Sequence, residues 1–265
     1  MDYSQILSQQ FNIKEEYAKN IITLLDDGNT IPFIARYRKE MHGSMDDQLI
    51  REFAEKLEYL RGLDKRRDEI RSLIDAQEKL TDEINLALDK AATLSELEDI
   101  YRPYRPKRKT RASIAKEKGL EPLANDILKQ EKGFDPSKSA VDYIDEEKGV
   151  TSVEDAIQGA MDIIAELVSD NAEIRKRIRN LTNANGVLVS VATDEEKDSV
   201  YKNYYDYKEP VKKIAGHRVL AVNRGEKEGF LKVSVETDSE KPLNSIFRAM
   251  ITDKNQLCSD IIREA

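Results

Sequence analysis

The sequence predicts a mainly α-helical protein that carries one small β element. Apolar residues recur at intervals of three and four along most of the chain, which is the spacing of one face of a helix. Pairs of residues that typically cap helix N-termini precede several of these stretches. Only from Val187 does the pattern change to the alternation that is typical of strands. We therefore expect a multi-helix scaffold with a small β element near residues 187–237.

The first half of the chain is expected to form several helices in succession. Asn12 with Glu15 three residues later reads as the cap of a first helix. Residues 30–38 are a tight connection that opens a brief helix, since Pro32 lacks a backbone donor. The longest helix is expected over residues 44–77. Two shorter ones follow at 81–91 and at 95–101, the second opened by a capping pair of Ser95 and Glu98.

The next helices are expected at 111–118 and 121–130, separated by Gly119, a residue suited to the left-handed position at a helix end. This pair could form a helix-turn-helix-like unit, although short helices joined at glycine also occur in proteins that never touch DNA. A looser acidic stretch at 131–148 is a possible domain junction. Ser152 with Asp155 then caps a strong helix, and a second helix ends near residue 185.

The apolar pattern after residue 186 predicts short strands at 187–192, 218–222 and 230–235, the last two forming a hairpin around residues 225–229. A helix is expected from 245 to the end. The predicted organisation is therefore a helical domain at 1–130 with a basic loop at 102–111, a helical segment at 131–186, and a β element with a C-terminal helix at 187–265.

Composition and charge restrict the class of protein. Apolar residues make up 39% of the chain and charged residues 35%, which is typical of a folded domain with a dense solvated surface. No export signal or long apolar run is found, and Cys258 is the single cysteine, so the expected location is the cytoplasm. The net charge of -8 argues against general binding to a polyanion.

One segment departs from this acidic average. Residues 101–118 contain eight Lys or Arg against the single Glu117, a local charge of +7 that leaves -15 for the rest. Cations bind phosphates, tyrosines stack on unpaired bases, and Pro103 and Pro106 keep the chain extended. The predicted nucleic-acid-binding residues are Arg102, Tyr104, Arg105, Lys107, Arg108, Lys109 and Arg111. The alternative is that these cations pair with the acidic excess of neighbouring helices and clamp the domain together.

A second, smaller basic group consists of Arg36, Arg38 and Lys39 beside Tyr37. Its flank is apolar, so we expect the group to be partly buried and Arg36 or Tyr37 to have a structural role.

Residues for catalysis or for holding a metal are sparse. His42 and His217 lie far apart, and no His or Cys spacing suits a transition metal, so neither a metal nor another cofactor is expected. The glycines at 225 and 229 resemble a phosphate-binding loop only superficially, because no Lys-Ser or Lys-Thr follows. We expect no enzymatic activity.

Several segments, in this order, closely resemble the N-terminal region of the Tex family of bacterial transcription accessory proteins. They are residues 30–40 (TIPFIARYRKE), 57–61 (LEYLR), 96–101 (ELEDIY), 103–111 (PYRPKRKTR), 119–124 (GLEPLA) and 215–226 (AGHRVLAVNRGE). The resemblance implies a largely helical scaffold with a helix-turn-helix-like unit, associated with nucleic acid and related to a eukaryotic elongation factor. Complete members continue into RNase-H-like, helix-hairpin-helix and RNA-binding OB-fold domains, so this chain is expected to be an N-terminal fragment with weak nucleic-acid affinity of its own.

The leading hypothesis is a nucleic-acid-associated scaffold of the transcription machinery, which contacts the RNA or DNA backbone through the basic loop. The competing hypothesis is a protein-interaction platform that docks polymerase or ribosome components and uses the basic loop internally. Neither hypothesis involves a membrane.

Overall fold

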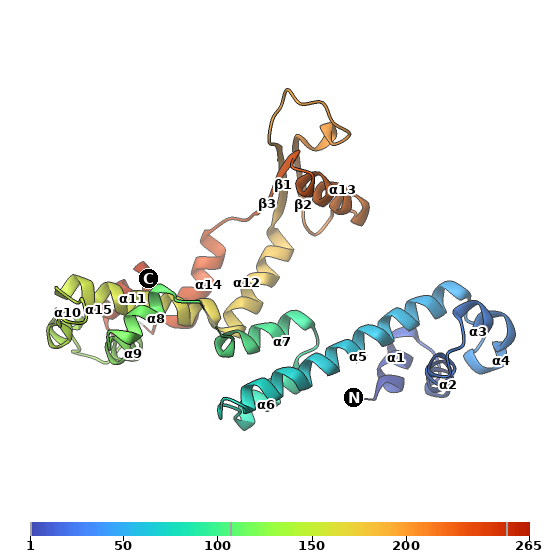
Figure 1. Cartoon of the computed structure of the whole chain (residues 1–265), viewed down its shortest axis with the longest axis horizontal. Coiled ribbons are helices and arrows are strands. Elements are labelled where there is room, and N and C mark those ends of the chain that lie inside the picture. The colour runs from blue at the N-terminus through green and yellow to red at the C-terminus, as the bar shows by residue number, and fades with distance from the viewer. Residues whose placement is uncertain (1, 107, 253) are drawn as a thin grey trace. The chain divides into compact units, whose positions relative to one another are not determined.

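The computed structural model describes residues 2–106, 108–252 and 254–265, and it confirms a mainly α-helical protein with a small β element (Figure 1). Contacts divide the chain into two compact units, Met1–Tyr104 and Arg105–Ala265. The elements of the first unit are α1 (Tyr3–Phe11), α2 (Glu15–Asp26), α3 (Ile31–Tyr37), α4 (Lys39–His42), α5 (Asp47–Asp75), α6 (Asp82–Lys90), α7 (Leu94–Tyr101) and the 3-10 turn η1 (Arg102–Tyr104).

Helix α5 is the axis of the first unit, and it confirms the long helix predicted from apolar spacing. It has 29 residues and is therefore about 44 Å long at 1.5 Å per residue. Its first half buries Ile50 and Phe53 in a core shared with α1, α2 and α3. Its second half buries Ile70 and Ile74 in another core shared with α6 and α7. The two cores are thus built on opposite ends of one helix.

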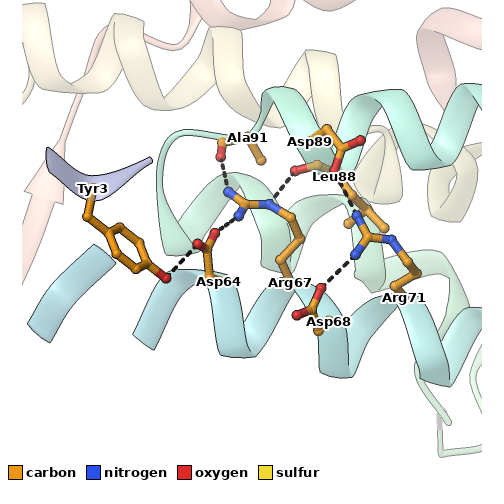
Figure 2. Close-up of polar contacts among 8 residues, drawn as sticks. All are labelled: Tyr3, Asp64, Arg67, Asp68, Arg71, Leu88, Asp89 and Ala91. Carbon is orange, nitrogen blue, oxygen red and sulfur yellow. Dashed lines mark hydrogen bonds and ion pairs between the residues drawn. The ribbon is translucent and has the colours of Figure 1, made fainter. Parts of the chain in front are cut away.

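A buried arginine joins α5 to the end of α6 (Figure 2). Arg67 is 5% exposed; its Nε donates to the Leu88 carbonyl at 2.9 Å and its Nη2 to the Ala91 carbonyl at 3.0 Å. Its third contact is Asp64, which also accepts from the Tyr3 hydroxyl at 2.8 Å. The last carbonyls of a helix have no partner within the helix. Arg67 supplies that partner for α6 and so fixes the corner that leads to α7.

The second unit contains the helices α8 (Arg111–Glu117), α9 (Glu121–Lys129), α10 (Pro136–Ala140), α11 (Val153–Asp170), α12 (Ala172–Asn185), α13 (Gly216–Lys227), α14 (Glu240–Met250) and α15 (Gln256–Glu264). It also contains the strands β1 (Val187–Ala192), β2 (Asp206–Pro210) and β3 (Leu231–Glu236), and the 3-10 turns η2 (Val141–Tyr143) and η3 (Lys202–Tyr204).

The core of the second unit lies around α11, which packs against α8, α9, α10 and α15. Ile163 and Ile164 are fully buried there. Gly159 on α11 permits α8 and α9 to approach α11 closely. A Cβ at this position would lie 2.3 Å from the Cδ1 atom of Leu120, the residue just before α9. Residues between Ala112 and Leu128, from the segment that we expected to join residues 1–104 in one domain, contribute to this core. So does Ala140, from the acidic stretch that we predicted as a domain junction.

The β element is an antiparallel sheet in the order β2-β1-β3. In its register Val189 of β1 lies opposite Lys208 of β2 and Ser234 of β3. The paired helices α12 and α14 lead into and out of the sheet. Helix α13 packs on β3, and Gly225 lets the helix approach the Leu231 side chain, which a Cβ would meet at 2.6 Å.

Four local predictions are wrong, and one of them is the single helix expected from residue 245 to the end, which the structure divides into α14 and α15. Residues 218–222, predicted as a strand of a hairpin, belong to α13, while the strands at 187–192 and 231–236 are confirmed. Asn12 does not open a helix; it ends α1 with a left-handed backbone (φ 51°), and α2 begins at Glu15. Thr93, not Ser95, caps α7, because its side chain accepts from the Glu96 backbone N–H.

Gln130 ties the end of α9 to the segment between α14 and α15. It is 1% exposed; its Nε2 donates to the Met250 carbonyl at 2.8 Å, and its Oε1 accepts from the Thr252 backbone N–H at 2.9 Å. We expect Gln130→Ala to lower the free energy of unfolding by about 2 kcal/mol, because both backbone groups lose a buried partner. Urea unfolding followed by circular dichroism measures this loss. A change below about 0.5 kcal/mol would show that water replaces the amide.

Candidate nucleic-acid interface

The predicted basic segment begins in the first unit, where its first residues are not fully open to solvent. Tyr101 is 6% exposed in the core shared by α5, α6 and α7. Tyr104 is half-buried against the same core, and burial raises the pKa of its phenol. The Tyr104 carbonyl accepts from the Gln77 side chain at 2.9 Å. The Tyr104 ring therefore offers only part of its surface for base stacking, and Arg102 is likewise half-buried.

The rest of the segment belongs to the second unit, and the cations that the structure describes there are exposed. Arg105, Arg108, Lys109 and Arg111 are exposed, whereas Lys107 lies outside the described residues. No ion pair of Arg108 is found within the part of the chain that the structure describes. The structure thus places an exposed run of cations directly before α8.

Lys109 and Arg111 have carboxylate partners among the described residues. Lys109 Nζ lies 3.3 Å from Glu117 Oε2, and the two side chains are 67% and 64% exposed. Arg111 Nε lies 3.5 Å from Asp162 Oδ1, with the arginine side chain 83% exposed and the aspartate 16% exposed. The Lys109–Glu117 pair is exposed on both sides and contributes roughly 0–1 kcal/mol, since water and salt screen it. The Arg111 guanidinium is itself largely exposed, although its partner Asp162 is not. Both cations therefore remain accessible to a stronger anionic ligand.

The end of the segment is held in place by the start of α8. The Thr110 hydroxyl accepts from the Ser113 backbone N–H at 3.0 Å, and the Ser113 hydroxyl accepts from the Thr110 N–H at 2.8 Å, a reciprocal cap. The Thr110 hydroxyl also donates to Glu166 Oε1 on α11 at 3.0 Å. Residues 110 and 111 are thus anchored on α11, at Glu166 and Asp162, while Arg108 and Lys109 are exposed.

Sequence reasoning found the cations but not their anchor. Asp162 and Glu166 lie one turn apart on α11 and more than 50 residues from their partners. The Thr110-x-x-Ser113 pattern, readable as a cap, was the available signal for the start of α8.

The second basic group differs from our expectation. Arg36, Tyr37, Arg38 and Lys39 are all exposed, and Tyr37 is 58% exposed. The prediction of partial burial was wrong because the apolar flank is buried mainly through Ile34, whereas the basic residues stand at the exposed end of α3 and the start of α4.

The remaining chemically distinctive side chains are dispersed. Cys258 is buried, and burial raises the pKa of its thiol. His42 is buried with its Nε2 3.1 Å from the Ile34 carbonyl oxygen, whereas His217 is exposed on α13. Within the described ranges no three His, Cys, Asp or Glu side chains gather as a metal site would require. None of the helices in these ranges is long and apolar enough to cross a membrane.

The fold and the site define a class of protein: a helical scaffold that carries exposed cations next to an anchored helix start. Residues 1–75 match the family profile described as Tex-like protein N-terminal domain, and residues 131–264 match the profile described as Tex central region-like. The chain belongs to the Tex family.

Relatives agree with this assignment. The chain is 42% identical to YdcI of Bacillus subtilis over 100% of its own length and 38% of that protein. It is 39% identical to YhgF of Escherichia coli, covering 95% of the chain and 33% of the relative. It is also 39% identical to the transcriptional accessory protein Tex of Neisseria gonorrhoeae, covering 89% of the chain and 31% of the relative. The chain therefore spans about a third of the length of these relatives.

Proposed function

We propose that this chain is a non-enzymatic, nucleic-acid-associated scaffold of the transcription machinery in the cytoplasm. Arg105, Lys107, Arg108, Lys109 and Arg111 contact the phosphate backbone of RNA or DNA. The proposal takes its biological context from the name of the Neisseria relative, a transcriptional accessory protein. The observation that carries it is the exposure of the Lys109 and Arg111 side chains, 67% and 83%, despite their carboxylate partners.

On binding, Lys109 and Arg111 would exchange their carboxylate partners for phosphates of the nucleic acid. A phosphate presents concentrated negative charge to several cations at once and releases condensed counterions, a gain that an exposed Lys–Glu pair does not offer. The cap at Thr110 fixes one end of the cationic run on α11, so little ordering is needed at that end when a ligand binds.

Replacement of Lys107, Arg108, Lys109 and Arg111 by Gln tests the proposal. We expect affinity for a fluorescent oligouridylate, measured by anisotropy, to fall at least about tenfold at low salt. The slope of log affinity against log salt should become shallower by about 3, since each lost single-strand phosphate contact removes about 0.7. Without the substitutions, five contacts give a slope of roughly -3.5.

A matched control removes four other exposed cations of the same unit, Lys129, Lys132, Lys138 and Lys148. This variant has the same net charge as the first but keeps the basic segment. It should lose much less affinity than the loop variant. Equal losses in the two variants would mean that only overall charge matters, and full retention by the loop variant would exclude the segment as the contact.

The second candidate is a protein-interaction platform in which the basic segment is used internally. The observation that favours it is the anchoring of the segment's end, through Arg111 on Asp162 and Thr110 on Glu166. Polymerase or ribosome components would then bind elsewhere on the acidic surface. Recovery of the same partners from lysate with and without nuclease separates the two functions, because only a nucleic-acid-mediated association is lost after digestion.

A further inference from the structure

The outer face of α3 in the first unit carries a continuous strip of planar groups. The rings of Phe33 and Tyr37 have centroids 5.4 Å apart and are tilted by 44°. The Arg38 guanidinium lies 5.4 Å from the Phe33 centroid. Tyr37 is 58% exposed and Phe33 is half-buried. We call Phe33, Tyr37 and Arg38 the α3 strip.

The cations at the α3 strip are not used for internal ion pairs. Arg36, Arg38 and Lys39 are exposed, and none of them has an ion pair among the residues that the structure describes. On neighbouring α5, in contrast, Arg61 pairs with Asp26 at 2.7 Å and Arg66 with Glu98 at 2.7 Å. In an acidic protein, three adjacent unpaired cations are a surface that attracts anions.

The α3 strip is held on a fixed support, so its exposure is not a sign of fraying. Ile34 is fully buried, and its carbonyl oxygen lies 3.1 Å from His42 Nε2. The Asn20 side chain on α2 donates to the Met41 carbonyl at 3.1 Å, which ties α4 to α2. Gly43 turns the chain with φ +64° directly against the Tyr17 ring, where a Cβ would lie 2.6 Å from a ring carbon. The aromatic rings are therefore preorganised at the surface.

An open groove of about 550 Å³ lies beside the α3 strip, but its charge is mixed. Arg36 and Lys39 contribute to its lining together with Asp46 and Asp47. The Asp46 side chain accepts from the Leu49 backbone N–H at the start of α5. Two carboxylates make this groove a poor phosphate site, so the α3 strip is the better ligand surface.

We propose that the α3 strip is a stacking platform for unpaired bases of single-stranded nucleic acid, with the exposed Arg38 guanidinium as the cation beside the stacked bases. Base stacking on aromatic rings and guanidinium planes is tolerant of sequence, and the neighbouring cations follow the backbone. The ligand class follows from the proposed function, but the residues are different and belong to the other unit. An acidic peptide would use the cations without needing the exposed Tyr37 ring and the half-buried Phe33 ring beside it.

The absence of tryptophan from the chain permits a direct test. Tyr37→Trp, made in the full chain, introduces a single indole at the α3 strip. Its emission should be quenched when oligouridylate or oligodeoxythymidylate is added, because a base stacks on the ring. The quench should persist when the basic segment carries the four Gln substitutions described above. This persistence distinguishes the platform from the loop contact, and a failure of one leaves the other measurable.

Tyr59→Trp is the matched control. Tyr59 is 41% exposed, and the Lys56 ammonium lies 4.9 Å from its ring centroid. The exposed carboxylates Glu52 and Glu55 line a groove on α5 together with Tyr59. Its indole should not be quenched by oligonucleotide. Separately, Tyr37→Ala should weaken oligonucleotide binding about tenfold, whereas Tyr37→Phe should retain it.

Three outcomes would overturn the platform. The first is an indole that stays unquenched in the Tyr37→Trp variant while anisotropy reports binding. The second is equal quenching in the Tyr37→Trp and Tyr59→Trp variants. The third is equal quenching by polyglutamate, which would assign the surface to acidic peptides instead.

Discussion

Replacing Arg67 by Met should lower the free energy of unfolding of the first unit by about 4 kcal/mol, the range found when one partner of a buried ion pair is removed. Methionine matches the length of the arginine stem but supplies no donor. The carbonyls of Leu88 and Ala91 and the carboxylate of Asp64 would then all lose a partner next to the core. Urea unfolding followed by circular dichroism measures the loss, and amide exchange should show α6 opening first.

Arg71, one turn along the same helix, is the matched control. It pairs with Asp68 at 2.6 Å and Asp89 at 2.7 Å, but its side chain is 31% exposed and both carboxylates are more than half exposed. Arg71→Met should therefore cost about 0.5–1 kcal/mol. Adding Asp64→Asn to Arg67→Met should recover part of the large loss, because the carboxylate charge that faced Arg67 is removed. Similar costs for the two arginines would contradict the assigned role of Arg67.

The helices of the first unit were predictable because their signals are local. The apolar spacing of α5 is set by residues three and four apart, and the structure begins and ends this helix within about three residues of the predicted bounds. Arg67 was not predictable in this way. Its partners on α6 and at Ala91 lie 21 and 24 residues away, and only the packed corner brings them together.

The failed prediction at residues 218–222 has a different cause. Five residues of alternating and apolar character suit either a strand or one face of a helix, and periodicity alone cannot choose between them. The structure chooses the helix α13, in which Val222 and Gly225 lie three residues apart and face the sheet. The close approach to Leu231 that favours this packing is a tertiary contact without a local signal.

For the basic segment and the α3 strip, too, the residue types could be read from the sequence, but their packing could not. The charge of the basic segment could be counted from the sequence, whereas its anchoring on Asp162 and Glu166 depends on how α8 packs against α11. For the group around Tyr37 the composition was clear but the direction of each side chain was not. Ile34 is fully buried, whereas Tyr37 at the end of α3 is 58% exposed, and composition alone does not distinguish the two.

Replacing Gly159 by Val should lower the free energy of unfolding of the second unit by about 3 kcal/mol, at the upper end of the usual cost of overpacking. The first added carbon alone would lie 2.3 Å from Leu120 Cδ1 and 3.4 Å from Ala115 Cβ. Leu120 is 1% exposed and has no solvent to move into. Since α8 carries the anchor of the basic segment, binding of oligouridylate should weaken together with stability. Thermal and urea unfolding measure the first effect and anisotropy the second.

Gly62 provides the control, because it is also a glycine within a helix but a Cβ there would meet nothing within 4 Å. Gly62→Ala should stabilise the chain by about 0.5–1 kcal/mol, since alanine loses less conformational freedom in a helix. Gly159→Ala gains the same helical preference and still incurs the contact with Leu120, so the difference between the two alanine variants isolates the packing cost. In a double-mutant cycle, the variant with both Gly159→Ala and Leu120→Ala should be about 1–2 kcal/mol more stable than the sum of the two single effects predicts, as expected for residues in contact. If the two glycine-to-alanine changes proved equally stabilising, α8 and α9 would not be packed on α11 as closely as Gly159 requires, and the support proposed for the basic segment would be lost with that packing.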